Sequence, residues 1–275
     1  MAARATGLIG GGVLLLMVAV AVGAPLIAPQ GYAQQNLAAG LKPPGWIDGG
    51  SWSHALGTDS LGRDILSRVV WSARVSLGIA SLSTLISMSL GVLLGLVSGY
   101  YGGALDAMLM RIADVQLSFP FLVLAIAVMA LLKPSLVVLV LLLALPGWVI
   151  YARTVRSQAM SLRRREFVQA AVAIGASHRR VILMHLIPNV IPSVIVLSSF
   201  QAGLIINIEA TLSFLGVGVQ PPTPSWGNML SAGREYFSTA WWLGVFPGIA
   251  VTLTTLGANL VGDGLRDALD PRLKF

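Results

Sequence analysis

The chain has 275 residues, of which 56% are hydrophobic and only 11% are charged, whereas about a quarter of the residues in a typical soluble domain are charged. The net charge of +7 comes from arginines set between apolar runs, which is typical of a membrane protein's cytoplasmic loops rather than of a nucleic-acid-binding protein. The absence of cysteine excludes disulfides, thiol catalysis and cysteine metal ligands. We therefore predict an all-α, polytopic integral membrane protein in contact with the lipid bilayer.

Six apolar segments predict six transmembrane helices, because each is close to the roughly 20 residues needed to cross a bilayer. They run over Gly7–Ala28, Ser76–Tyr100, Val115–Leu132, Ser135–Tyr151, Val190–Leu212 and Trp241–Val261. The third and fourth are short and meet at Lys133-Pro134, which predicts a helical hairpin. Prolines interrupt several spans, and transmembrane helices tolerate such breaks where neighbours satisfy the freed carbonyls.

The first segment has two interpretations. Arg4, the apolar run and the triplet Ala19-Val20-Ala21 have the order of a cleaved signal peptide. The apolar run, however, continues past the triplet to Ala28. We therefore predict that residues 1–29 form an N-terminal transmembrane helix.

Residues 30–75 form the loop between the first two spans and carry a charged motif. Asp64 and Arg68 have the spacing of an ion pair on one helix face, and Thr58 or Asp59 is suited to cap that helix. The motif predicts an interfacial helix that leads into the second span. Contact with another protein is the alternative.

Three glycines recur at every fourth residue of the second span, at Gly91, Gly95 and Gly99. This spacing allows another helix to approach closely. The simpler interpretation is that another helix of this chain packs here. The more specific one is contact with a second permease subunit.

The loop after the fourth span sets the orientation. It holds Arg153, Arg156, Arg163, Arg164, Arg165, Arg179 and Arg180 against the single acid Glu166. The positive-inside rule then predicts that this loop is cytoplasmic. Counting spans in both directions predicts cytoplasmic termini, a cytoplasmic tail at residues 263–275, and extracytoplasmic loops at residues 30–75 and 213–240.

A polar segment from Glu166 to Asn189 predicts two short helices joined by a glycine turn. Phe167, Ala170, Ala171 and Ile174 share one small apolar face. Gly175 follows where a helix C-cap belongs, and Ser177 can cap the second helix. The segment predicts a docking surface for a soluble partner. The alternative is an amphipathic helix whose arginines meet lipid headgroups.

This segment resembles the coupling loop of bacterial ABC importer permeases. The matching residues are Gln169, Ala170, Ala171, Gly175, His185, Pro188 and Asn189, and Gln169 stands where the family has glutamate. Three further blocks, Leu56–Leu77, Glu209–Leu230 and Asn259–Leu273, are similar to the C-type permease of dipeptide, oligopeptide and nickel importers.

The resemblance implies a subunit of the bacterial inner membrane with a five-helix core at residues 76–262 and a coupling loop at residues 163–189. It implies three kinds of partner: a homologous B-type permease, two ATPases and an extracytoplasmic substrate-binding protein. Glu166, Phe167 and Ile174 join the motif residues as the expected ATPase contacts. Di- or oligopeptides are the expected substrates, with nickel or another small solute as the alternative.

The chain itself offers no nucleotide site, because each of its lysines follows a leucine and none belongs to a P-loop. ATP and magnesium are therefore expected on partner subunits, and no cofactor is expected in this chain. An ion-driven secondary transporter is a competing class, but such proteins usually carry acids near the midplane. We predict that the chain is not an enzyme and has no catalytic residue.

Glu209 stands in a nearly charge-free run, where a carboxylate is costly and usually faces a cavity or a partner. A gate or pathway role and a structural role both fit Glu209 and its neighbour Asn207. His54, His178 and His185 lack the spacing of metal ligands, so no metal site is predicted.

Overall fold

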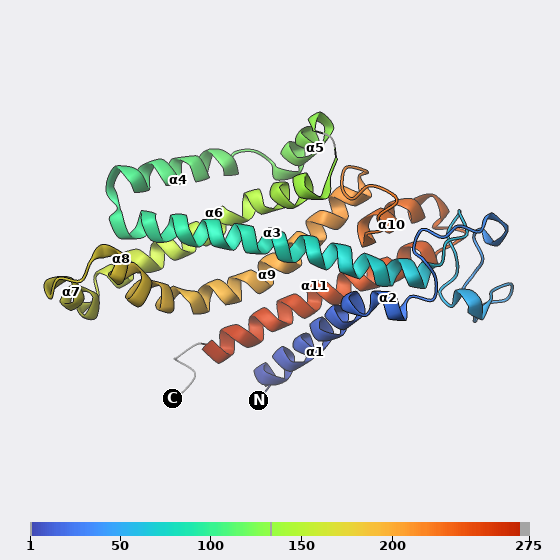
Figure 1. Cartoon of the computed structure of the whole chain (residues 1–275), viewed down its shortest axis with the longest axis horizontal. Helices are drawn as coiled ribbons and strands as arrows, with labels where there is room; N and C mark the ends of the chain where they lie inside the picture. The colour runs from blue at the N-terminus through green and yellow to red at the C-terminus, as the bar shows by residue number, and fades with distance from the viewer. Residues whose placement is uncertain (1, 133, 270–275) are drawn as a thin grey trace.

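Long apolar helices build the fold and confirm the all-α prediction. The computed structural model describes residues 2–132 and 134–269. The helix α3 (Ile65–Tyr101) runs along most of the molecule, beside α6 (Leu136–Arg163), α9 (Ile187–Phe214) and α11 (Trp242–Leu269) (Figure 1). Only their lengths and composition identify them as membrane helices.

The predicted six spans are matched in part. Among the described residues, four helical stretches are long and apolar enough to cross a membrane: Ile65–Tyr101, Leu136–Arg163, His178–Phe214 and Trp242–Leu269. A bent pair, α4 (Gly103–Leu117) with α5 (Phe121–Leu131), makes a fifth if it is one span. The N-terminal helix α1 (Ala2–Val22) is apolar but shorter.

The predicted third span, Val115–Leu132, is not one helix. Its first residues end α4 and the remainder forms α5, with a bend of 82° between the two helices. Pro120 lies at this break. Proline has no backbone N–H and disfavours helical geometry in the residue before it, which explains the interruption. Lys133, in the predicted hairpin turn, lies outside the described residues.

The glycine repeat of α3 serves packing within the chain. A Cβ atom added at Gly91, Gly95 or Gly99 would come within 2.5 to 2.6 Å of a backbone carbonyl oxygen of α6. Earlier on the same side, Ser83 and Ser87 donate hydrogen bonds to α6 carbonyls at 3.0 and 2.8 Å. Small residues thus let the two backbones touch over several turns, as the simpler interpretation predicted.

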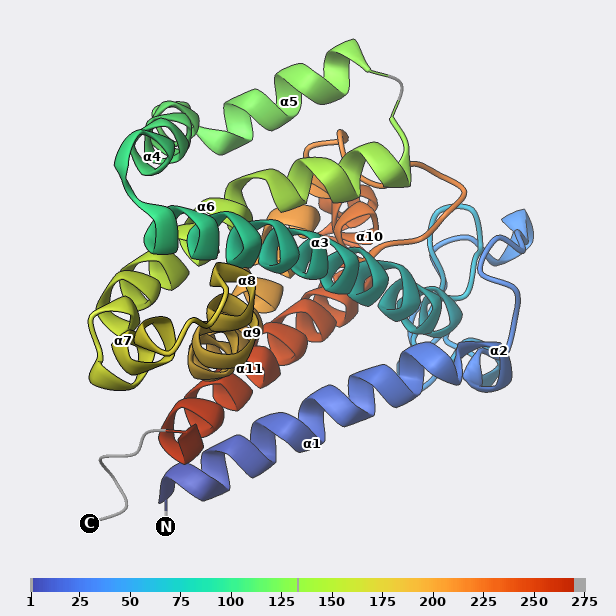
Figure 2. The same ribbon diagram turned by 60° about the vertical axis from the view of Figure 1, so that its left-hand side comes forward.

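The N-terminal helix packs along α11, and the two run side by side in both ribbon views (Figures 1 and 2). Glycines again meet at the contact: a Cβ atom on Gly264 would lie 2.5 Å from the Gly7 Cα atom. A short helix, α2 (Ala24–Ile27), follows α1. This packing favours a retained helix over the signal-peptide interpretation. Helix α11 itself extends to Leu269, beyond the predicted span end, and residues 270–275 of the predicted tail lie outside the description.

Residues 28–64 fold over the first turn of α3 and contain two short 3-10 helices, η1 (Leu37–Ala39) and η2 (Trp52–His54). The Thr58 hydroxyl joins two parts of this loop by donating to the Ala39 carbonyl and accepting from the Lys42 N–H. Thr58 therefore does not cap α3.

The charged motif differs from its prediction. Asp64 itself caps α3, with its Oδ2 atom 2.8 Å from the Ser67 backbone nitrogen. Arg68 pairs with Asp59 instead of Asp64, and Asp59 also accepts from Arg63 at 2.7 Å. The expected Asp64–Arg68 pair was wrong because the carboxylate of Asp64 accepts from the N–H and hydroxyl of Ser67 and contacts His54 instead. No separate interfacial helix precedes the span in the described loop, since α3 is continuous from Ile65.

Candidate functional site

The polar segment predicted as a docking surface lies at one extremity of the bundle. We call this the α7 end, comprising residues 162–189 together with Tyr100 and Tyr101. It contains α7 (Glu166–Ala173), α8 (His178–Val181) and a π-helical turn, η3 (Ile182–Leu186), that leads into α9. The predicted order of helix, glycine turn and helix is observed, at the end opposite α10 (Figure 1).

The glycine turn has a defined geometry. Gly175 has a φ angle of +87°, which glycine adopts without the strain that other residues incur. Its N–H donates to the Val172 carbonyl and the next N–H, of Ala176, donates to the Ala171 carbonyl, both at 3.0 Å. These two bonds are the Schellman motif, which closes a helix. Ser177 then caps α8 by accepting from the Arg180 N–H at 3.4 Å, as predicted.

The buried side of α7, which bears Val168 and Ala171, seats the helix on the bundle. Val168 is 1% exposed and joins an apolar cluster. The other cluster members come from α3, α6, α8, the π-helical turn and α9: Leu96, Tyr100, Tyr151, Val155, Ala159, Val181, Leu186, Val190 and Val194. The remainder of α7 projects from the bundle, so this short helix has one buried side and one open side.

The open side is not quite the predicted face. Phe167 and Ile174 are 47% and 87% exposed, and Ala170 is exposed as well. Ala171, the fourth member, is only 8% exposed because it lies on the side of α7 that bears Val168. The periodicity placed these four residues on one narrow face of the helix, but it did not show which part of that face meets the bundle.

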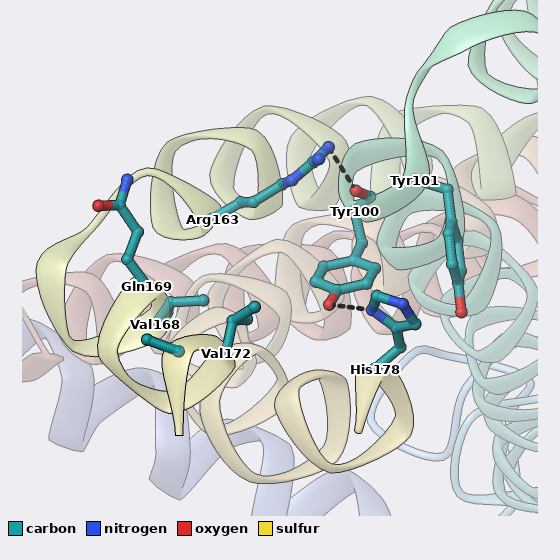
Figure 3. A pocket seen from close by; sticks show the side chains of 8 residues that line it. Tyr100, Tyr101, Arg163, Val168, Gln169, Val172 and His178 are labelled. Atoms are coloured by element: carbon teal, nitrogen blue, oxygen red, sulfur yellow. Dashed lines mark hydrogen bonds between the residues drawn. The ribbon is translucent and has the colours of Figure 1, made fainter. Parts of the chain in front are cut away.

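A cavity of about 460 Å³ lies between α7 and the last turn of α3. The Tyr100 hydroxyl is 2.7 Å from His178 Nδ1, and their ring centroids are 5.6 Å apart (Figure 3). Arg163, at the end of α6, donates to the Tyr100 carbonyl at 2.8 Å. Tyr101 and Gln169 complete the rim. The cluster links α3, α6 and α8 beside α7.

Little in the amino-acid sequence predicts this cluster. Tyr100 and Tyr101 end an apolar span, which is the usual position of interfacial aromatic residues. Their partner His178 lies 78 residues away from Tyr100 in the sequence, so local spacing does not connect them.

The last motif residues shape the start of α9. The Asn189 side chain donates to the His185 carbonyl at 2.7 Å, and the His185 ring lies 6.2 Å from the ring of Phe167 on α7. Pro188 lacks an N–H and so removes one helical hydrogen bond where the π-helical turn gives way to α9. A π-helical turn of this kind often marks a functional position.

Polar residues surround the open side of α7. Gln169 is exposed, and its side-chain nitrogen lies 3.4 Å from the Arg164 carbonyl at the end of α6. Glu166 occupies the first turn, where a negative charge favours the helix dipole. Glu166 and Phe167 also line an open hollow of about 750 Å³ with Asn189. The surface is therefore apolar at its centre and charged at its margin.

Glu209 lies far from α7 and is 1% exposed. Its Oε2 atom accepts from the Ser76 hydroxyl of α3 at 3.1 Å, and its Oε1 atom accepts from the Ser213 hydroxyl at 2.7 Å. Ser213 also accepts from the Val219 N–H at 3.0 Å, and its oxygen lies 3.5 Å from the hydroxyl of Ser225. This network ties α3, α9 and the following loop together.

Ser225 extends the same network into α10 (Trp226–Gly233). It caps that helix in a capping box with Asn228. A 3-10 turn, η4 (Arg234–Tyr236), then leads toward α11. We call the region of residues 28–64 and 209–243 the α10 end.

Asn207 lies on a different side of α9 from the buried Glu209. It is exposed, and its side-chain nitrogen donates to the Gly203 carbonyl at 3.0 Å and to the Thr255 hydroxyl of α11 at 3.2 Å. The two candidate pathway residues therefore face different surroundings.

The histidines do not gather. His54 contacts Asp64 at 3.2 Å in the α10 end, whereas His178 and His185 belong to the α7 end. Within residues 2–132 and 134–269, no group of three or more histidine, aspartate or glutamate side chains has the arrangement of a metal site.

Comparison with known proteins decides the family. Residues 91–275 match the model of the binding-protein-dependent transport system inner membrane component. The chain belongs to this family of transport permeases. Residues 4–44 of the permease also match the N-terminal transmembrane domain of oligopeptide transport permease C, which explains the helix that precedes the core.

Curated relatives agree over almost the whole permease. It is 41% identical over 262 residues to the dipeptide transport system permease protein DppC of Alkalihalophilus pseudofirmus, covering 95% of this chain and 84% of that protein. It is 42% identical over 261 residues to the di/tripeptide transport system permease protein DppC of Pseudomonas aeruginosa, covering 95% and 86%. A glutathione transport system permease protein of Pectobacterium atrosepticum is 40% identical, with 95% and 85% covered.

These matches confirm the resemblance to ABC importer permeases. The permease is a multi-pass inner-membrane transport subunit and not an enzyme. Transport that depends on a binding protein implies such a protein, an ATPase and a partner permease.

Proposed function

We propose that this chain is the C-type permease of a peptide importer and forms half of the pathway for di- or oligopeptides. The names of the relatives support a peptide substrate, since those proteins serve dipeptides, di- and tripeptides or glutathione. A B-type permease would supply the other half. Two cytoplasmic ATPases would bind ATP and magnesium, and an extracytoplasmic protein would deliver the substrate. An importer for nickel or another small solute is the alternative.

The open side of α7 is the main support for the proposal that this chain couples to the ATPases there. Phe167, Ala170 and Ile174 present an apolar patch on a short helix at the extremity of the bundle. An exposed apolar patch with a charged margin is suited to a protein partner. We therefore assign the ATPase contact to α7 and the turn after it. The set comprises Glu166, Phe167, Gln169, Ala170, Ile174 and Gly175 at the surface, with Ala171, His185, Pro188 and Asn189 supporting the shape.

The contacts beneath α7 suggest how movement of the helix would reach the spans. Val168 packs among residues of α3, α6 and α9, and Tyr100 joins α3 to α8 through His178. Closure of the ATPase pair would push α7, and these contacts would carry the displacement into three spanning helices. The spans would then alternate between inward-open and outward-open arrangements without covalent chemistry in this chain.

The α7 end also indicates how the protein is oriented in the membrane. The exposed arginines Arg164, Arg165, Arg179 and Arg180 support a cytoplasmic α7 end by the positive-inside rule. Both termini would then be cytoplasmic, and the α10 end extracytoplasmic.

Labelling of a single cysteine tests this orientation. The chain has no cysteine of its own, so Ser177→Cys introduces a unique thiol beside the exposed turn. An impermeant thiol reagent should modify it in inside-out vesicles and not in intact cells. Modification in intact cells would reverse every loop assignment.

A surface substitution tests the coupling assignment. Ile174→Ser removes the highly exposed apolar side chain at the C-cap of α7 and should reduce both co-purification of the ATPases and substrate-stimulated ATP hydrolysis. Met184→Ser is the matched control, because Met184 is 67% exposed at the same end but belongs to the π-helical turn η3 rather than to α7 or its cap. Equal effects of the two substitutions would show that α7 has no special role in binding the ATPases.

The energy source is tested separately. Peptide uptake by the assembled importer should require the ATPases and persist when an uncoupler collapses the proton gradient. Uptake that stops with the uncoupler while ATP remains available would favour an ion-driven carrier.

For Glu209 we propose a structural role. Its oxygens accept from hydroxyls on two helices, and those hydroxyls continue to the cap of α10. Such a network fits a fixed joint better than a moving gate.

A further inference from the structure

Two apolar spanning helices carry an exposed line of amides and hydroxyls. On α9 these are Asn207 and Thr211, one turn apart, and both are exposed. On α11 they are Thr252, Thr255 and Asn259, of which the first is exposed and the others are half-buried. Residues three, four and seven apart share one side of a helix. Each helix therefore has an exposed polar stripe.

The two stripes meet. The Asn207 side-chain nitrogen lies 3.2 Å from the Thr255 hydroxyl oxygen across the α9–α11 contact. One turn earlier, a Cβ atom on Gly203 would lie 3.3 Å from the Asn259 Oδ1 atom, so glycine lets the amide of Asn259 approach α9. We call Asn207, Thr211, Thr252, Thr255 and Asn259 the polar seam.

The polar seam is poorly matched to lipid. Within residues 2–132 and 134–269, the side chains of Thr252 and Asn259 make no hydrogen bond, and the Asn207 oxygen accepts none. Polar groups without partners are costly in hydrocarbon, so they usually face a water-filled cavity or a partner. By contrast, the exposed side chains of residues 7–22 on α1 are all apolar, as lipid requires.

The same side of the two helices continues into a hollow. Ser193 and Phe200 of α9, seven residues apart, line a cavity of about 410 Å³ together with Arg266 of α11. Arg266 follows Asn259 by seven residues, and Asn207 follows Phe200 by seven residues, so cavity and seam lie on one face. From Ser193 to Thr211 this face extends about 27 Å at 1.5 Å per residue, close to the roughly 30 Å of a bilayer's hydrocarbon core.

We propose that the polar seam and this cavity form the wall of the substrate passage contributed by this chain, and that the seam holds peptides through their backbone groups. This inference rests on the proposed function. Asparagine and threonine each offer both donors and acceptors, which is the pattern of the peptide bond. The seam carries no charge, so it does not select among peptide side chains by charge.

Thiol accessibility tests the wall without any substrate. In the assembled importer, in membranes opened so that reagent reaches both faces, Asn207→Cys and Thr252→Cys should react with a water-soluble, impermeant methanethiosulfonate. Leu82→Cys on α3 and Leu16→Cys on α1 should not react, since those exposed leucines fit a lipid-facing surface. Seam cysteines as unreactive as the leucine positions would overturn the proposal, because the seam would then face lipid or a permanent contact with the second permease.

Transport kinetics test the substrate chemistry. Thr255→Val should raise the KM for Ala-Ala, Lys-Ala and Glu-Ala by a similar factor, about two- to tenfold for the loss of one hydrogen bond. Thr254→Val is the matched control and should leave KM unchanged, because Thr254 is buried and its hydroxyl bonds the Ala250 carbonyl. An effect confined to one charged peptide would overturn backbone recognition. If the seam cysteines react but the importer transports no peptide, the peptide substrate is refuted. The assignment of the seam to the substrate passage would then still stand.

Discussion

The two ends of the molecule close a helix in the same way and then use it differently. At the α7 end, Gly175 has a φ angle of +87°, and at the α10 end Gly216 has +83°. Gly216 and Val217 donate to the Ser213 and Leu212 carbonyls, both at 3.0 Å, which repeats the Schellman pattern found after α7.

What surrounds each turn distinguishes the two ends. Beside Gly216, Ser213 joins the fully buried Glu209 network, so the chain is held on several sides. An added Cβ atom would meet no atom within 4 Å at either glycine, so the turns differ in their neighbours: Ile174, beside Gly175, is 87% exposed, whereas Leu215, beside Gly216, is 51% exposed. One local motif thus serves a fixed joint at one end and an open contact at the other.

The largest effect on stability is expected at the buried hydrogen-bond network around Glu209. Glu209→Ala removes the acceptor of the Ser76 and Ser213 hydroxyls, and leaving buried polar groups unpaired costs about 1–3 kcal/mol. The yield and melting temperature of the purified complex should fall. Glu235→Ala, an exposed acid at the same end, should change neither. If Glu209→Ala melts normally but does not transport, Glu209 acts as a gate and the comparison fails.

The next effect separates stability from coupling. Gly175→Val forces a branched residue into a left-handed conformation at a cost of roughly 1–2 kcal/mol, with free space around it. The complex should assemble and hydrolyse ATP, but import fewer peptides per ATP. Gly216→Val has the same backbone cost and the same free space, but its turn is tied to the buried Glu209 through Ser213. It should therefore lower the melting temperature at an unchanged ratio of import to hydrolysis. The same loss of coupling in both variants would mean that the ends do not differ in role.

A smaller effect is expected beneath α7. Tyr100→Phe removes the hydroxyl that bonds His178 at 2.7 Å, a contact worth about 1 kcal/mol. Substrate-stimulated ATP hydrolysis should fall while basal hydrolysis is kept. Tyr101→Phe provides the control, because Tyr101 is 51% exposed and only its ring packs against its neighbours. Identical kinetics for Tyr100→Phe and the wild type would show that this contact does not transmit motion.

The smallest effect concerns the motif position that departs from the family. Gln169 is exposed and makes one long hydrogen bond to the Arg164 carbonyl. Gln169→Glu adds a surface charge near arginines, and such pairs contribute about 0–1 kcal/mol. Import should stay within about fivefold of the wild-type rate. A tenfold change measured in the same uptake assay would show that this side chain pairs with a partner's charge.

Local features were predictable from the sequence. The turn at Gly175 and the cap at Ser177 depend on residues within one or two turns of each other, so residue type and position identify them. The repeat of Gly91, Gly95 and Gly99 likewise predicted close packing, although only the structure shows that α6 is the neighbour.

Features that depend on distant residues were not predictable. Asp59 binds Arg68 by folding back across the cap of α3, which helical spacing alone does not suggest. Ala171 is buried because of how α7 rests on the bundle, and periodicity within one helix does not set that direction. Glu209 bonds Ser76 across 133 residues, so its surroundings were open until the helices were placed. The break at Pro120 lay inside an apolar run that hydropathy treats as one span.

The glycine contact between α3 and α6 also determines the mechanics of the molecule. Two helices whose backbones touch over several turns tilt together as one stiff beam. Helix α3 has 37 residues and is therefore about 55 Å long at 1.5 Å per residue. A tilt of about 5° pivoting at the α7 end displaces the far end of such a beam by about 5 Å, the length of one helical turn. The push on α7 proposed above would thereby be geometrically amplified into a movement at the α10 end as large as a side chain.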